Sequence, residues 1–327
     1  MLCVTVSYEM SSRHKILKKK EVLVIAHDAG GAEIIAAYLR AHAPRFLFRS
    51  YIAGPACRIF RREGIPFKHA PSSRSGLERI IKKHAHVAYA LLGTGWMTGL
   101  ETTALSQAKR LDVKTCVYLD SWKNYRERFG FPAVGWQMNL PDEIWVGDTK
   151  AYTLAKRYFD CRIRFVKNQY FADIGRRFKT LQKKALKDLI LFVSAPVAES
   201  EGILADLLEN LTMEETSPTV RIRRHPADNP RRYNALIKRY QKHLHVEMSR
   251  EKDILQDLTR ARAVVGFETT ALAVAAMLGV GSITVMHSNR EVVLPFFRML
   301  RVNNAKEALR RIKDIGSHRK DSFSIGK

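Results

Sequence analysis

The sequence Arg-Arg-His-Pro at 223–226 has the residue types of a phosphate site, and it follows a strand-like run at 219–222. Arg223 and Arg224 can each bind phosphate oxygens through paired hydrogen bonds, and His225 can donate to a phosphate or protonate a leaving oxygen. Because open α/β sheets bind ligands beyond the carboxyl ends of their strands, this stretch predicts a site for a phosphate-bearing anion. The alternative is a solvated basic strand end.

A second candidate is the helix start at Thr269 and Thr270, which follows an apolar strand and a glycine. Threonine hydroxyls, free backbone N–H groups and the positive end of a helix dipole all suit an anion. The five residues Glu-Thr-Thr-Ala-Leu occur at both 101–105 and 268–272, an offset of 167 (268 − 101), which indicates two similar halves. The alternative, ordinary helix capping, is favoured for the first copy.

In the first half, the turn His27-Asp28-Ala29-Gly30-Gly31 follows the apolar run 21–26. His27 or Asp28 would end a strand and could act as a general base towards an attacking hydroxyl. Gly30 and Gly31 let the backbone approach a ligand closely. The turn lacks the GxGxxG spacing of a dinucleotide site, and an Asp helix cap in a glycine turn is the alternative.

Asp120 ends another expected strand, 114–119, and is the reserve candidate for the general base. Trp122, Tyr125 and Arg126 follow it in a long loop, where binding residues often lie. The aromatic faces and the guanidinium could hold a sugar acceptor. The alternative is an aromatic cluster that packs the loop onto its domain.

The chain has 327 residues, of which 46% are hydrophobic, enough for two medium domains with real cores. Its four cysteines form no CxxC pair, which fits a reducing compartment. The longest weakly polar run, 271–286, is too short for a membrane span, and the N-terminus has no signal-peptide pattern. We therefore expect a cytoplasmic protein.

Short apolar runs alternate with helical patterns along the chain, which predicts α/β architecture: two Rossmann-like, doubly wound parallel-sheet domains facing a cleft. A weakly patterned basic stretch separates the two halves. The expected divisions are a basic N-terminal extension at 1–20, a first domain at 21–168, a linker at 169–187, a second domain at 188–316 and a polar tail at 317–327.

This layout and the two motifs of the second half resemble glycosyltransferases of the GT-B fold. The resemblance is greatest to bacterial families with a His-Pro motif: bacterial sialyltransferases, CDP-glycerol glycerophosphotransferase and capsule-polymer enzymes. It implies that His225, Thr269 and Thr270 bind the nucleotide phosphates and that Arg223 and Arg224 add charge. The first domain would then bind the acceptor.

Two departures from those families are visible. The usual Gly-x-Ser-Thr is here Gly-Phe-Glu-Thr-Thr, which puts Glu268 among the nucleotide-binding candidates, and the first half has no Asp-Asp-Gly or Glu-Asp-Gly turn. No Asp-x-Asp triad occurs, so we expect no obligatory metal, and nothing indicates a cofactor.

The resemblance implies a metal-independent transferase that moves a sugar or polyol phosphate from a nucleotide-activated donor, with CMP or CDP favoured over UDP, to a cell-surface glycan or lipid-linked acceptor. One alternative is a nucleotide-sugar epimerase or hydrolase on the same fold. The net charge of +24 also allows a basic nucleic-acid-binding protein, although no nucleic-acid-binding module is recognisable. We expect this charge to hold the enzyme against an anionic membrane surface.

Overall fold

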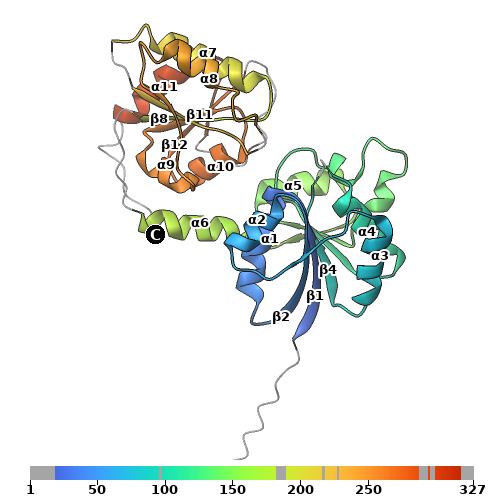
Figure 1. Cartoon of the computed structure of the whole chain (residues 1–327). Coiled ribbons are helices and arrows are strands. Elements are labelled where there is room, and N and C mark those ends of the chain that lie inside the picture. The colour runs from blue at the N-terminus through green and yellow to red at the C-terminus, as the bar shows by residue number, and fades with distance from the viewer. Residues whose placement is uncertain are drawn as a thin grey trace, which may run out of the picture.

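The protein consists of two α/β domains, each built on one parallel sheet (Figure 1). The computed structural model describes residues 19–95, 98–181, 189–215, 218–226, 228–286, 294 and 299–317. In this part of the chain every strand pairing is parallel, as the alternation of strands and helices predicts.

The first sheet has seven strands in the order β3-β2-β1-β4-β5-β6-β7. Its order reverses between β1 and β4, so the carboxyl ends of β1, β4 and β5 lie side by side. The strands are β1 Lys20–Ala26, β2 Phe46–Ile52, β3 Lys68–His69, β4 Tyr89–Leu92, β5 Thr115–Tyr118, β6 Glu143–Val146 and β7 Arg162–Phe165. Strand β1 is buried over its last five residues because helices cover both faces of the sheet.

The helices of the first domain pack in two layers. Helices α1 and α2 cover one face with their own apolar cluster, and α3, α4 and α5 cover the other. Their bounds are α1 Ala29–His42, α2 Ala56–Arg62, α3 Arg74–Lys83, α4 Leu100–Arg110, α5 Thr149–Tyr158 and α6 Gln169–Thr180, with the 3₁₀ turns η1 Glu127–Phe129 and η2 Trp136–Asn139. Helix α6 packs against α1 and contacts α9 of the second domain.

The second sheet has six strands in the order β10-β9-β8-β11-β12-β13 and repeats the topology of the first, with β8 in the place of β1 and β11 in that of β4. Helices α9 and α10 lie on one face, and α7, α8 and α11 lie on the other. The elements are β8 Leu189–Val193, α7 Glu199–Leu211, β9 Thr219–Arg223, α8 Asn234–Tyr240, β10 Val246–Met248, α9 Ile254–Arg260, β11 Ala263–Gly266, α10 Thr270–Met277, β12 Gly281–Val285, β13 Met299–Val302 and α11 Ala305–Ser317.

The predicted fold class is confirmed, but several helices and strands were missed. Strand β3 has two residues, β7 reads Arg-Ile-Arg-Phe with three exposed positions, and neither carries the apolar run of a buried strand. Helix α3 and strand β13 were also not expected. The predicted linker coincides over much of its length with α6, a regular helix, and its residues 182–188 lie outside the described residues, as do most of the predicted N-terminal extension and of the polar tail.

The repeated Glu-Thr-Thr-Ala-Leu sequence lies at equivalent places, after β4 in one domain and after β11 in the other. The helices begin at different points of the motif. Helix α4 starts before Glu101, whereas α10 starts after Thr269. The two glutamates therefore occupy different surroundings although their sequences match.

Candidate active site

The carboxyl ends of β1 and β4 bring His27, Asp28 and Glu101 together. The backbone N–H of His27 donates to Oε1 of Glu101 at 2.7 Å, and the imidazole Nδ1 lies 2.7 Å from Oδ1 of Asp28. The His27 and Asp28 side chains are 22% and 26% exposed, so this pair is open to a ligand. Gly54 lies against the imidazole, with φ of 54° and no room for a Cβ, and so fixes the ring.

Glu101 is the buried member of this group, with 3% of its surface exposed. Its Oε2 has no hydrogen-bond partner among the described residues. Burial raises the pKa of Glu101, and the charge of Asp28 adds to this, against the opposite effect of the hydrogen bond from the His27 N–H. A Cβ on Gly95 would lie 2.8 Å from Oδ2 of Asp28 and 2.9 Å from Oε2 of Glu101, so only glycine lets the two carboxyl groups converge here.

Asp120, at the end of β5, forms a second acidic centre beside the first. Its Oδ1 accepts from Nη1 of Arg128 at 2.5 Å and from the Thr94 hydroxyl at 3.2 Å. Arg128 also donates to the Thr94 carbonyl at 2.6 Å, which ties the ends of β4 and β5 together. A Cβ on Gly30 would overlap Oδ2 of Asp120, so this glycine makes room for the carboxylate at the start of α1.

The structure thus joins the predicted His27, Asp28 and Asp120 at one edge of the sheet and places Gly30 among them. Gly31 is buried, and a Cβ there would meet only ordinary contacts, so close approach does not require glycine at this position. Asp28 occupies the N-cap position of α1, as the capping alternative expects, but its side chain makes no capping hydrogen bond and lies against His27 instead.

Trp122 and Tyr125 are buried, at 5% and 4% exposure. The indole of Trp122 donates to Asp148 and stacks on Phe171, and the Tyr125 ring stacks on that of Phe159. Neither ring offers an open face to a sugar, so the packing alternative describes these two residues. The Arg126 guanidinium lies 4.2 Å from the centre of the Phe131 ring and is only half-buried.

In the second domain, His225 follows β9 and its backbone N–H donates to the Ser194 hydroxyl at 2.7 Å. That hydroxyl donates to Oδ2 of the buried Asp228 at 2.5 Å, and Arg232 pairs with the other oxygen of Asp228 at 2.8 Å. Burial lowers the pKa of His225, against a smaller opposite effect of Asp228. The neutral imidazole therefore prevails at neutral pH.

Arg223 does not serve as a phosphate fork in this structure. Its Nη1 donates to Oδ2 of Asp257, which is fully buried, at 2.7 Å, and to the carbonyl of Glu251 at 3.1 Å. The neighbouring Arg224 donates to the carbonyl of Asp228. Both guanidiniums therefore bind groups of the protein itself, so the strand end differs from the solvated basic strand end that was the alternative to a phosphate site.

Thr269 caps α10 by accepting from the N–H of Leu272, while Thr270 is exposed at the first position of that helix. Glu268 turns towards the first domain, and its Oε2 lies 2.5 Å from the Lys123 ammonium. That ammonium also lies 5.7 Å from the centre of the Phe267 ring. This contact joins the loop after β5 to the start of α10 and so links the two candidate sites.

Sequence reasoning overlooked the residues that organise both sites: Thr94, Glu101, Lys123, Arg128, Ser194 and Asp228. Glu101 belongs to the first copy of the repeated Glu-Thr-Thr-Ala-Leu motif, in which only the threonines were considered as binding residues. Arg128 gave no signal because it reaches Asp120 only through the turn η1.

No family model and no curated protein matches the sequence. Solved structures do match. They include UDP-GlcNAc 2-epimerase from Neisseria meningitidis bound to UDP-GlcNAc, with a TM-score of 0.66, 10% identity and coverage of 91% of this chain and 92% of that one. Anabaena Alr3699/HepE in complex with UDP has a TM-score of 0.61 and 10% identity, with coverage of 92% of this chain and 91% of that one. Acinetobacter baumannii MurG has a TM-score of 0.54 and 12% identity, with coverage of 91% of this chain and 89% of that one.

The chain has the GT-B fold. Coverage of about nine-tenths on both sides means that both domains and their order are shared with these structures. A likeness at this level of identity establishes the fold and leaves the reaction open. No described helix is both long enough and apolar enough to cross a membrane.

Proposed function

We propose that this protein is an enzyme that acts on a nucleotide-activated sugar. In this proposal the nucleotide binds the second domain near His225 and the start of α10, and the sugar lies over His27, Asp28 and Asp120. The support is topological, because both groups occupy carboxyl edges of parallel strands, where open sheets bind ligands. The proposal is also supported by structural neighbours that hold UDP or UDP-GlcNAc. Uridine nucleotides are therefore candidates in addition to CMP and CDP.

The proposed reaction is epimerisation of the sugar, in preference to its transfer. The observation that carries this choice is the presence of two acid–base centres, His27–Asp28 at the end of β1 and Asp120–Arg128 at the end of β5. Inverting a C–H centre requires a base to remove a proton and an acid to return one, whereas a transferase needs one base for its acceptor. The epimerases among the structural neighbours favour the same choice.

The residues have distinct roles in this proposal. Asp28 or Asp120 takes the proton from the sugar carbon next to the anomeric carbon, and the C–H electron pair forms a C=C bond as the nucleotide leaves with the electron pair of the anomeric C–O bond. The nucleotide then adds back to the anomeric carbon while the other group returns a proton to the opposite face of the sugar. Glu101 lies behind Asp28, too deep to touch the sugar, and fixes the turn through the His27 N–H. Arg128 holds Asp120 in place by a charge-assisted hydrogen bond.

Deuterium exchange separates the two reactions. The enzyme would be incubated in D₂O, without an acceptor, with UDP-, CMP- and GDP-sugars, and products would be followed by NMR. We expect one epimer to convert into another with deuterium at the inverted carbon. An unchanged sugar in every case, together with transfer once a glycan acceptor is added, would overturn epimerisation and favour the glycosyltransferase.

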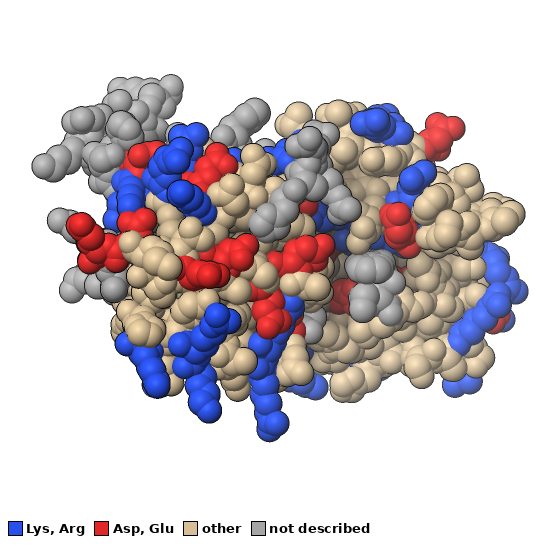
Figure 2. All heavy atoms as spheres, turned by 90° about the horizontal axis from the view of Figure 1, so that it is seen from above, with Lys and Arg blue, Asp and Glu red and all other residues tan. Residues whose placement is uncertain are grey.

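Membrane attachment remains a separate part of the proposal. Figure 2 shows Lys and Arg side chains projecting along one edge of the molecule, next to a band of Asp and Glu. Each basic group near an anionic membrane contributes about 1 kcal/mol. Co-sedimentation with anionic and with neutral vesicles tests this. Equal pelleting with both would mean that the net charge of +24 serves solubility and not membrane binding.

A further inference from the structure

Strand β7 forms one edge of the first sheet. It pairs with β6 from Arg162 opposite Glu143 to Phe165 opposite Val146, and no other described strand pairs with its outer side. An edge strand presents N–H and C=O groups that can pair with a further strand. Proteins use such edges to bind extended peptides by strand addition.

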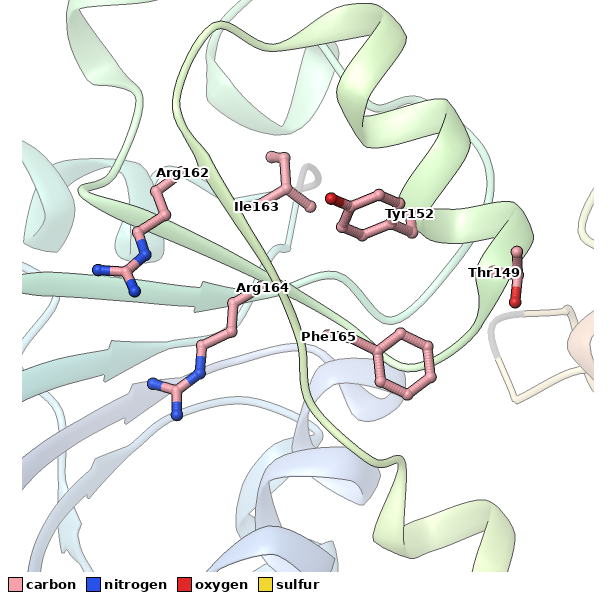
Figure 3. Close-up of a pocket in the computed structure, with 6 residues that line it drawn as sticks. All are labelled: Thr149, Tyr152, Arg162, Ile163, Arg164 and Phe165. Atoms are coloured by element: carbon pink, nitrogen blue, oxygen red, sulfur yellow. The ribbon is translucent and has the colours of Figure 1, made fainter.

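The two faces of β7 differ in chemistry. Figure 3 shows Ile163 and Phe165 on the side of α5, near Tyr152, while Arg162 and Arg164 extend the other way. These residues and Thr149 line a hollow of about 440 Å³. Phe165 is 57% exposed and Tyr152 is 36% exposed, so the apolar side of the hollow is open to a partner.

The arginine face has more positive charge than its own carboxylate can balance. Glu143, whose side chain is 2% exposed, accepts from Lys114 at 2.8 Å and from the Trp145 indole at 3.0 Å. The guanidiniums of Arg162 and Arg164 lie farther from it, at 3.6 and 3.7 Å, and are 72% and 57% exposed. Three cations thus face one carboxylate, and the outer two are placed to bind further carboxylates.

We propose that β7 binds an extended segment of an acidic partner protein, in which acidic and apolar residues alternate. Side chains of an added strand alternate between the faces of the sheet. Its carboxylates would meet Arg162 and Arg164, and its apolar residues would enter the hollow beside Tyr152 and Phe165. A second copy of this chain fits poorly, because pairing β7 with itself would place like charges opposite each other. A glycan offers no row of backbone groups for the edge.

The test uses a labelled eight-residue peptide of alternating Glu and Val, with a peptide of the same composition and all Glu at one end as its control. Binding to the full chain is measured by fluorescence anisotropy. We expect only the alternating peptide to bind, with affinity that falls as salt rises, and slower hydrogen exchange at residues 162–165. Equal binding of the two peptides, or no change in exchange at β7, would overturn the proposal.

Variants locate the binding. Arg162→Glu/Arg164→Glu and, separately, Phe165→Ser should each weaken binding at least tenfold. The control Arg79→Glu/Lys83→Glu reverses two exposed charges on α3 and should leave it unchanged. If Phe165→Ser and Arg162→Glu/Arg164→Glu both bind the peptide as the original chain does, the acidic-strand proposal is wrong. It is also wrong if sedimentation velocity shows a dimer that Arg162→Glu/Arg164→Glu abolishes.

Discussion

Replacing Glu101 by Gln should make the protein relatively more stable as pH rises. Burial raises the pKa of Glu101 above its ordinary value of 4.5, with a further contribution from Asp28. In the unfolded chain this carboxyl ionises near its ordinary pKa, while in the folded chain it stays protonated to higher pH. The unfolded state therefore binds fewer protons in that interval, and the free energy of unfolding falls as pH rises from about 4.5 towards the folded pKa.

The size of the effect follows from that difference in proton binding. Across the interval in which only the unfolded state is ionised, this group costs about 1.4 kcal/mol of stability per pH unit. Glutamine has the same shape, keeps the oxygen that accepts from the His27 N–H and cannot ionise. Its amide nitrogen would take the place of Oε2, which has no hydrogen-bond partner among the described residues.

Urea unfolding at pH 4, 5, 6 and 7 measures this. The difference in free energy of unfolding between Glu101→Gln and the original chain should move in favour of Gln as pH rises above about 4.5, and it should become constant once pH passes the folded pKa of Glu101. Glu209→Gln, on the exposed face of α7, is the matched control and should give a difference that is constant with pH. A difference for Glu101→Gln that is constant over the whole pH range would refute a raised pKa of the buried Glu101.

Three more predictions concern the candidate sites. His225→Ala should weaken nucleotide binding roughly ten- to hundredfold, or about 1.5–3 kcal/mol, by calorimetry, and unchanged affinity in a folded variant would remove His225 from the site. Arg223→Met should lower the free energy of unfolding by about 2–3 kcal/mol and leave nucleotide affinity unchanged. The expected loss is smaller than the about 3–5 kcal/mol for breaking a fully buried ion pair, because the Arg223 side chain is 22% exposed. Asp28→Asn and Asp120→Asn should each lower turnover by about 10²–10⁴-fold with nucleotide affinity kept, and retained turnover in both would place the acid–base groups elsewhere.

The sequence was most informative about buried strands. Strand β8 is apolar throughout and β1 is apolar over its last five residues, because parallel strands are covered on both faces. The strand predicted at 21–26 agrees with β1 to within one residue at each end. Edge strands lack this signal. Strand β7 alternates two arginines with Ile163 and Phe165, and it resembles a polar loop until its pairing with β6 is known.

The candidate site was partly predictable for a similar reason. His27, Asp28 and Asp120 each follow an apolar run, and parallel strands put such residues at one edge of a sheet. Their partners could not be predicted, since Arg128 reaches Asp120 from a short 3₁₀ turn and Asp257 reaches Arg223 across 34 residues. A basic sequence motif shows which charges are present, but the buried carboxylates decide which of them remain available to a ligand.

The repeated motif shows how one sequence serves two purposes at equivalent points of the fold. In the first domain α4 starts early, so Glu101 turns inward, accepts from the His27 N–H and supports the His27–Asp28 turn. In the second domain α10 starts late, so Glu268 stays outside the helix and pairs with Lys123 of the first domain. Lys123 precedes η1, whose Arg128 donates to the Lys123 carbonyl and holds Asp120. A continuous chain of polar contacts therefore runs from Asp120 in the first domain to the start of α10 in the second, and we expect it to hold the two candidate sites in a fixed relative position.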